Sequence, residues 1–539
     1  MIYHLAAMKK TNPLLNSISK FSVIAKKVFF FLPFFESWWF RVSIFCLLFL
    51  FPSFSPAREA QITILFTNDH HGQVDPVRES DSSKPVGGVT RRMALIEKIR
   101  KEVGEQNVIL VDGGGLFTGT ALSGLTNGEV DCAAYQLMRY DAIVMGVHDF
   151  DYGKKYFLET RKKYKTPWIS ANVVSAGQPF MRPYVLKYAG IRVGMIGFSN
   201  PDTPKLTHRD NVRGLAFNPP GQTAKGLHSI FKKDADIFVV LSHLGVEADK
   251  KFAKDNPFIH VVIGGFSETV LKDPIVNLGK DGNLVGPIIG QAGSNGLYLG
   301  RLDLSVEGHR DPKTKNASYS ITDYHYKLIP ITADLPEDPQ MTALLEKFKG
   351  QLKEKPLGET LATISGDFTL ATQGDSLIGM TATDAMRKAA QTEIALLNND
   401  SFKSDFKSGD LTRDIFYQIY PADDEVVALD LPGSYLRKMI EASAVKKGQG
   451  GFLQVSGLKI EKTGEGLNIT VGNEPLSEKR KYLVAVSDFL AGGGDGYELL
   501  LRVKSRRKTQ LMVRELLERA LKDKQKISPA DFEKRWNIP

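Results

Sequence analysis

"VILVDGGGLFTGT", residues Val108–Thr120, is the stretch that indicates how this chain of 539 residues folds. Its first part, Val108–Asp112, has the length and β-branched content of a buried strand. The strand stops at three glycines, Gly113–Gly115, which permit a tight turn or the close approach of a ligand. The GK[ST] ending of a phosphate-binding P-loop is missing, so the P-loop interpretation is disfavoured.

Short apolar runs and amphipathic segments alternate on both sides of this stretch, from about Gln61 to Val306. The other expected strands are ITILFTN (62–68), AIVMGV (142–147), RVGMIGF (192–198), IFVVLS (237–242) and IHVVIGG (259–265). The expected helices between them include VTRRMALIEKIRKEV (89–103) and DCAAYQLMRY (131–140). This alternation predicts an α/β domain built in layers.

The pattern changes after this region, which predicts further parts of the chain. A helix expected over about Asp338–Lys353 is polar on most faces and ends before Pro356, as is typical of a linker. Short strands and helices at about 380–390 and 433–443 follow, which predict an α+β second domain. We therefore expect a targeting segment (1–57), an α/β domain (58–335), a linker helix (336–356), an α+β domain (357–500) and a helical tail (501–539).

The first 57 residues have the features of a signal segment. Basic residues precede the apolar run VSIFCLLFLF (42–51), and small residues follow, with cleavage expected near Ala57. The apolar run is shorter than the roughly 20 residues that span a bilayer, so no stable span is expected after cleavage. An uncleaved anchor, and a true start at Met8, stay open. We expect export to the periplasm or cell envelope, with Cys132 as the one cysteine left and no intrachain disulfide.

The charge pattern argues against nucleic acid as a partner. The whole chain has a net charge of +9, but residues 58–539 hold 64 basic and 60 acidic residues that are interspersed along the sequence. The basic cluster KSRRK (504–508) is interpreted as an exposed helix face. No segment indicates an obligate protein partner.

Histidines and carboxylates follow several of the expected strands. They are Asp69 and His71, then His148 and Asp151, then His243, and finally Glu268. Each alone also fits a structural role, since Asn, Asp and Gly favour turns and a histidine at a strand end is often structural. Sites in open α/β sheets form outside the carboxyl ends of strands, so together they predict one common site. Imidazole and carboxylate suit divalent metals such as Mn²⁺ or Zn²⁺, a pair of which, about 4 Å apart, can clamp a phosphoryl transfer.

At this point the sequence resembles a known family. The blocks ITILFTNDHHG (62–72), GVHDFD (146–151), VVLSHLG (239–245) and VVIGGFSE (261–268) are similar to those of calcineurin-like metallophosphoesterases. The segments 409–444 and 482–497 resemble the C-terminal substrate domain of secreted bacterial 5′-nucleotidases and UDP-sugar hydrolases. The resemblance covers about Gln61–Tyr497 and implies a calcineurin-like layered domain, a linker helix and an α+β 5′-nucleotidase substrate domain.

The resemblance also implies roles for individual residues. Four positions keep the chemistry of the family's metal ligands: Asp69, His71, His243 and Glu268. His148 and Asp151 match a pair that stabilises the transition state. Three other ligand positions are substituted, by Gly115, Val147 and Phe266, and Gly115 falls where a carboxylate normally bridges two metals. We therefore expect one divalent metal, Mn²⁺, Zn²⁺ or similar, rather than two, or none.

The substrate positions implied by the resemblance are Lys403, Phe489 and Asp495. Lys403 replaces an arginine that contacts phosphate or carboxylate groups, Phe489 matches one of two base-stacking aromatics, and Asp495 matches a carboxylate suited to ribose hydroxyls. The second aromatic falls at Ala422, and nearby Tyr420 is a candidate substitute. The expected function is an exported phosphoesterase that hydrolyses nucleotides or related phosphate esters. The alternative is a catalytically degenerate relative that acts as an envelope binding or scaffold protein.

Overall fold

The structure, a computed structural model, describes residues 59–77, 84–280, 284–310, 317–352, 354–367, 374–464 and 466–538. The expected targeting segment, with Cys46 and the cleavage site near Ala57, lies outside these ranges. Within them, no helix has both the length and the apolar character that a membrane span requires.

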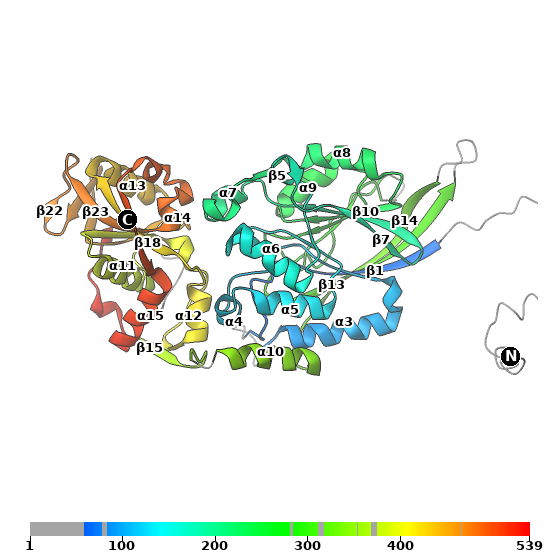
Figure 1. Cartoon of the computed structure of the whole chain (residues 1–539), viewed down its shortest axis with the longest axis horizontal. Coiled ribbons are helices and arrows are strands. Elements are labelled where there is room, and N and C mark those ends of the chain that lie inside the picture. Colours follow the sequence, from blue (N-terminus) through cyan, green and yellow to red (C-terminus); the bar gives the residue numbers. More distant parts are fainter. Residues whose placement is uncertain are drawn as a thin grey trace, which may run out of the picture. The chain divides into compact units, whose positions relative to one another are not determined.

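The first domain contains two large β-sheets that pack face to face, with helices outside them (Figure 1). One sheet has the order β14-β13-β1-β2-β3-β4, with β1 (Glu59–Thr67), β2 (Val108–Asp112), β3 (Ala142–Val144), β4 (Trp168–Ile169), β13 (Tyr298–Arg310) and β14 (Ala317–Pro330). The other has the order β12-β11-β10-β8-β7, with β7 (Tyr184–Tyr188), β8 (Ile191–Phe198), β10 (Ile237–Ser242), β11 (Val261–Gly264) and β12 (Ile288–Gly290). Strands β1–β4 are parallel, as are β8, β10, β11 and β12, so their carboxyl ends share an edge of each sheet.

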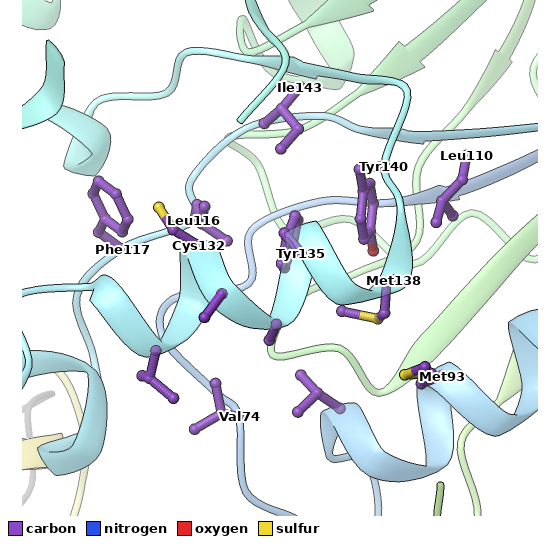
Figure 2. Packing of buried hydrophobic residues seen from close by; sticks show 14 of the residues in the cluster. Val74, Met93, Leu110, Leu116, Phe117, Cys132, Tyr135, Met138, Tyr140 and Ile143 are labelled. Atoms are coloured by element: carbon purple, nitrogen blue, oxygen red, sulfur yellow. The ribbon is translucent and has the colours of Figure 1, made fainter. Parts of the chain in front are cut away.

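Three hydrophobic clusters show the layering of this domain. The cluster between the sheets takes alternate residues of each strand, such as Ile64 and Val239, because successive side chains of a strand point to opposite faces. The remaining faces pack against helices on either side. These helices are α3 (Val89–Val103), α5 (Glu129–Met138), α6 (Gly153–Tyr164), α8 (Pro220–Phe231) and α9 (Val246–Asp255). Figure 2 shows Cys132, Tyr135 and Met138 of α5 within one of these clusters.

Shorter elements lie in the connections of the first domain. They are α4 (Ala121–Leu125), α7 (Thr203–Leu206), the 3-10 turns η1 (Glu105–Asn107), η2 (His148–Phe150) and η3 (Arg209–Val212), and the small sheet β6-β5-β9 formed by β5 (Val173–Ser175), β6 (Gln178–Pro179) and β9 (Leu215–Phe217). The turns η2 and η3 and helix α7 contribute residues to the lining of the site described below.

Helix α10 (Pro339–Gln351) occupies the place of the expected linker. It begins where the Asp338 side chain accepts hydrogen bonds from the backbone N–H groups of Gln340 and Met341, and Pro339 fits the first helical position. Although mostly polar, α10 buries Met341, Leu345 and Phe348 and packs on α3 and α5. The linker helix is therefore part of the first domain's packing.

The second domain is built on a five-stranded sheet of order β19-β16-β23-β18-β24. Its strands are β16 (Ile394–Asn398), β18 (Glu425–Pro432), β19 (Leu453–Ser456), β23 (Lys481–Ser487) and β24 (Arg506–Met512). The helices are α11 (Leu377–Ala390), α12 (Arg413–Ile419), α13 (Gly433–Val445), α14 (Asp488–Ala491) and α15 (Val513–Lys524), with 3-10 turns η4 (Asn399–Ser401), η5 (Gly494–Gly496), η6 (Glu498–Arg502) and η7 (Pro529–Asp531). Two smaller sheets contain β15 (Thr360–Ile364), β17 (Gly409–Thr412) and β25 (Lys526–Ile527), and β20 (Leu458–Thr463), β21 (Gly466–Val471), β22 (Glu474–Pro475) and β26 (Trp536–Asn537).

The expected helical tail is helical only in part: α15 (Val513–Lys524) is a helix, but the residues before it are not. Residues Arg506–Met512 form β24, which pairs antiparallel with β18, so the KSRRK cluster runs into a strand and not along a helix face. The free edge of β18 supplies hydrogen bonds that outweigh the helical preference of the segment. Trp536 is buried near the end of the described chain, and its indole N–H donates to the carbonyl of Leu453 at 3.0 Å. The packed second domain thus extends well beyond residue 500.

Candidate active site

Two loops at the carboxyl ends of β1 and β2 are joined by backbone hydrogen bonds. The N–H groups of Asp69 and His71 donate to the carbonyls of Gly114 and Gly115 at 2.8 and 2.9 Å. Asp69 and His71 have φ angles of 48° and 49°, a left-handed conformation that costs energy for residues other than glycine. Such strain gathers at functional sites.

A second strained loop follows β11 and meets the first. Phe266 and Glu268 have φ angles of 75° and 51°. The backbone N–H of Phe266 donates to both carboxylate oxygens of Asp69, at 3.0 and 2.9 Å. The structure therefore brings the ends of β1, β2 and β11 together, as the strand-end pattern predicts.

His70, which lies between the predicted ligands Asp69 and His71, fixes the first loop through the contacts of its buried side chain. Its side chain is fully buried, with Arg92 Nη2 3.1 Å from Nδ1 and Asp131 Oδ1 3.3 Å from Nε2. Because arginine can only donate, Nδ1 accepts and Nε2 carries the proton. Burial, aided by the charge of Arg92, holds the pKa of His70 well below its usual range, so it stays neutral. The sequence did not indicate this role.

Asp69 and His243 form one pair of predicted metal ligands. Nδ1 of His243 lies 2.8 Å from the carbonyl oxygen of Gly113 and 4.0 Å from Oδ1 of Asp69. A carbonyl only accepts, so Nδ1 carries the proton and Nε2 has the free lone pair. Burial lowers the pKa of His243 to about 4 and raises that of Asp69 to about 6.

His71 and Glu268 form the other pair. Nε2 of His71 lies 3.2 Å from Oε1 of Glu268, and a hydrogen bond to His71 holds the pKa of Glu268 below its usual range. The His71 ring also meets the His148 ring edge to face, with the ring centres 5.6 Å apart. The pair is thus turned toward the predicted catalytic residues.

These two pairs do not assemble into one metal centre. A Cβ added at Gly115 would lie 3.0 Å from Oδ1 of Asp69 and 3.2 Å from Cε1 of His243, so a side chain in the place of the bridging carboxylate would require these neighbours to shift by a few tenths of an ångström. Among the residues that the structure describes, no three His, Cys, Asp or Glu side chains are arranged to hold a metal ion. The donors present therefore do not fit a preassembled metal site.

Asp149 organises the glycine loop. Its buried carboxylate accepts hydrogen bonds from the backbone N–H groups of Leu116 at 2.8 Å, Gly146 at 2.6 Å and Gly115 at 3.2 Å. Burial raises the pKa of Asp149, against the stabilising effect of these amides. The sequence analysis gave this residue no role. A carboxylate at a strand end, beside a glycine loop whose backbone N–H groups need acceptors, was the signal that could have indicated this role.

His148 and Asp151 form a hydrogen-bonded dyad, as the resemblance implies. Nδ1 of His148 lies 2.9 Å from Oδ2 of Asp151, which also accepts a hydrogen bond from the Thr118 hydroxyl at 2.7 Å. Burial opposes protonation of His148, but the Asp151 carboxylate outweighs it and raises the pKa of His148. The dyad can therefore hold a proton on an imidazole whose orientation is fixed.

A cavity of about 360 Å³ brings the dyad together with residues of the second domain. Lys403, Phe489 and Ala422 line it along with His148 and Asp151. It does not include the four predicted metal ligands among its lining residues.

Two predicted substrate contacts are placed elsewhere. Asp495 is not among the residues that line the cavity. Its carboxylate accepts a hydrogen bond at 2.8 Å from the side-chain amide of Asn398, which does line it. Tyr420 is fully buried, packs on Phe402, and donates to Asp424 at 2.9 Å. The suggestion that Tyr420 substitutes for the missing base-stacking aromatic is therefore wrong, because its ring is committed to the core.

Comparison with known proteins agrees with this architecture. Residues 62–265 match the calcineurin-like phosphoesterase family, and residues 357–502 match the 5′-nucleotidase C-terminal domain. The chain thus belongs to the 5′-nucleotidase/UshA family of two-domain phosphoric ester hydrolases, which typically use divalent metals.

Several relatives match over most of their length. Protein UshA of Escherichia coli K12 is 25% identical over 521 residues, covering 87% of this chain and 92% of its own. The human 5′-nucleotidase is 28% identical over 505 residues, covering 82% and 84%. The crystal structure of a 5′-nucleotidase precursor from Thermus thermophilus is similar with a TM-score of 0.73 and 27% identity, over 89% of this chain and 99% of that one.

Proposed function

We propose that this protein is an exported phosphoesterase of the 5′-nucleotidase type that acts on nucleotides or related phosphate esters in the periplasm or cell envelope. The observation that carries the proposal is the His148–Asp151 dyad, which lines a cavity shared with the second domain. The family to which the chain belongs, and its matches to UshA and 5′-nucleotidases, support the reaction class.

In this proposal His148 acts on the leaving group. Water attacks phosphorus as the bond to the ester oxygen breaks, and the protonated imidazole donates its proton to that leaving oxygen, while Asp151 fixes the ring and stabilises its positive charge. The products are phosphate and the free alcohol, and the proton released by the water restores the imidazolium. Thr118 holds Asp151 in place through its hydroxyl. Because no three of the potential ligands among the described residues are arranged to hold a metal ion, we propose that the protein holds at most one divalent metal, with an affinity below that of a binuclear centre.

A degenerate relative that binds without catalysis is the second candidate. Gly115 favours it, because this residue leaves no carboxylate at the position of the bridging ligand.

Metal analysis and turnover separate the two. We would measure metal per chain by mass spectrometry and phosphate release from a nucleotide and phosphomonoester panel, with and without Mn²⁺ or Zn²⁺. Phosphate release that is lost in His148→Asn supports the hydrolase. No release under any of these conditions would favour the binding protein, and release unaffected by His148→Asn would exclude the proposed role of the dyad.

A further inference from the structure

The charged groups around the 360 Å³ cavity are unlike those expected for an anionic ligand. Six carboxylates line it: Asp151, Asp210, Asp400, Asp423, Asp424 and Asp488. The cationic residues of the lining are Lys403, Lys508, His148 and His208. Two of the carboxylates are neutralised from outside the lining, because Asp210 pairs with Arg213 and Oδ1 of Asp423 lies 2.9 Å from Nη2 of Arg514. The uncompensated negative charge is therefore to be sought among the remaining carboxylates.

The two lysines are already compensated by neighbouring carboxylates. Nζ of Lys403 lies 3.0 Å from Oδ2 of Asp400, and Nζ of Lys508 lies 3.5 Å from Oε2 of Glu425. Lys403 stands where the family resemblance implies an arginine; it lacks the guanidinium fork, and its charge is paired with Asp400. Little positive charge is left to attract a phosphate into this part of the cavity.

Two carboxylates, in contrast, lack a lysine or arginine partner. Among the described residues Asp424 makes no ion pair and accepts a hydrogen bond from Tyr420 at 2.9 Å. Asp488 accepts from the backbone N–H groups of Glu425 and Phe489, and its nearest cationic group is His208 at 3.8 Å. Burial, with the charge of Asp488, raises the pKa of Asp424 to about 7, as expected for carboxylates that share a partly buried wall.

The same wall carries aromatic surface but not a base-stacking pair. Phe489 and Tyr152 both line the cavity. Ala422 supplies no ring, and the ring of Tyr420 is buried in the core. Aromatic faces beside carboxylates are the surroundings in which proteins hold ammonium groups, because the ring quadrupole and the anions both attract a cation.

We propose that this cavity binds a small organic cation, with an ammonium group facing Asp424 and Asp488 beside Phe489. If the protein is the phosphoesterase proposed above, on which this extension rests, its substrate is an ester whose alcohol part carries a positive charge. The phosphate of that ester would lie at the His148 end of the cavity. Neutral nucleosides would lack the second stacking ring, and the triphosphate chain of a nucleotide would meet the carboxylates.

Binding of the alcohol part tests this without any turnover. We would titrate the full chain with choline, with glycerol as a neutral control and with adenosine, by calorimetry at low ionic strength. We expect choline to bind and both neutral compounds to bind at least tenfold more weakly. The double variant Asp424→Asn/Asp488→Asn should lose choline affinity by tenfold or more, whereas Asp234→Asn, which removes an exposed charge outside the cavity lining, should stay within twofold.

Thermal unfolding of each variant, and binding of choline to the single variants, control for misfolding. No choline binding to the folded parent, or unchanged binding in a folded double variant, would overturn the inference. Adenosine binding as tightly as choline would overturn it as well.

Turnover then distinguishes this inference from the proposed function. Faster hydrolysis of phosphocholine than of AMP supports both. Choline binding without release of phosphate from any ester would remove the hydrolase and leave the cation site. Hydrolysis of AMP without choline binding would support the hydrolase and exclude the cation site.

Discussion

The carboxylate of Asp149 accepts a hydrogen bond at 3.2 Å from the backbone N–H of Gly115, the residue that stands where the family resemblance implies a bridging carboxylate. The same carboxylate also serves the amides of Leu116 and Gly146. The glycine loop Gly113–Gly115 has no side chains that could hold it in place, and the carboxylate of Asp149 fixes its backbone instead.

Replacing Asp149 with Asn should therefore destabilise the first domain. An amide has one acceptor oxygen where the carboxylate has two, so at least one buried N–H would lose its partner, and the expected loss is about 2–4 kcal/mol in the free energy of unfolding. Urea unfolding followed by circular dichroism measures it. Asp234→Asn on the exposed surface, as the control, should change stability by less than about 0.5 kcal/mol. A loss no larger than the control's would mean that the loop does not depend on Asp149.

Substitution of Gly115 should be costly even by Ala. Its φ angle of 78° is left-handed, and an added Cβ would press on Asp69 and His243. The left-handed backbone alone costs roughly 1–2 kcal/mol for a residue with a Cβ, and the contacts add to it. Thermal unfolding of Gly115→Ala, with Gly177→Ala as a control that has a similar φ of 75° and an open neighbourhood, separates the two contributions. Equal losses in the two variants would show that the contacts at Gly115 relax freely.

Restoring the family's metal ligands should depend on the same contacts. Val147→Asn with Phe266→His supplies two donors without changing Gly115, and adding Gly115→Asp introduces the third against the strain just described. We expect a modest gain in Mn²⁺ or Zn²⁺ affinity in the double variant, measured by calorimetry. The triple variant should gain further only if the loop moves. A triple variant that binds two metals per chain at full thermal stability would show that Asp69 and His243 make room for a side chain at Gly115 without cost.

The dyad predicts a specific kinetic signature. His148→Asn should lower kcat by about 10²–10⁴-fold, the usual contribution of a positioned acid or base. Asp151→Asn should lower it less and shift the pH profile of kcat to lower pH, because the Asp151 carboxylate raises the pKa of His148. Thr118→Val removes a hydrogen bond to Asp151 and should act in the same direction more weakly. Steady-state kinetics over pH 5–9 measure these effects, and an unchanged profile in Asp151→Asn would contradict the assignment.

Asp249 should make stability depend on pH. Its carboxylate is fully buried, hydrogen-bonded to the hydroxyl of Ser242, and burial raises its pKa to about 7. The folded protein then keeps a proton that the unfolded chain loses near about pH 4, so this contribution to stability falls as pH rises from about 4 to about 7. Relative to the parent, the free energy of unfolding of Asp249→Asn should rise by on the order of 2 kcal/mol as pH increases across that window. Parallel stability curves for parent and variant between pH 4.5 and 8 would contradict this.

Cation binding should strengthen as pH rises. The pKa of Asp424 is raised to about 7, so the carboxylate is partly protonated near neutral pH and a cation binds its ionised form. Choline affinity should therefore increase severalfold from pH 6 to pH 8, with proton release on binding near pH 7, and Asp424→Asn should flatten the dependence. Calorimetry in buffers of different ionisation enthalpy measures the proton release.

Sequence periodicity predicted the central strands β1, β2, β3, β8, β10 and β11 of the first domain, because they are buried and read as continuous apolar runs. It missed the long strands β13 and β14, whose residues are in part exposed, and the short strands β4–β7, β9 and β12. Val108–Asp112 and Ile237–Ser242 match the observed strands residue for residue. The dyad was also predicted, since His148 and Asp151 sit three residues apart in a recognisable block.

What the sequence did not predict depends on contacts between distant segments. The strand Arg506–Met512 forms because β18 offers it an edge, about 80 residues earlier in the chain. The burial of Tyr420 follows from its packing on Phe402, and the strain at Phe266 from its hydrogen bonds to Asp69. Whether Asp69, His71, His243 and Glu268 hold a metal, and whether Lys403 and Asp495 contact substrate, stay predictions.

Helix α4 lies in the first domain by sequence, but Ala121 at its start belongs to the buried hydrophobic cluster of the second. α4 packs on α12, and Gly124 faces the ring of Tyr417, only 3.5 Å from where a Cβ would stand. The two halves are therefore not interchangeable modules. A fragment cut at the linker and expressed from Leu357 onward would carry an uncovered apolar face and tend to aggregate, so dissection of this protein is best done by point substitution within the intact chain.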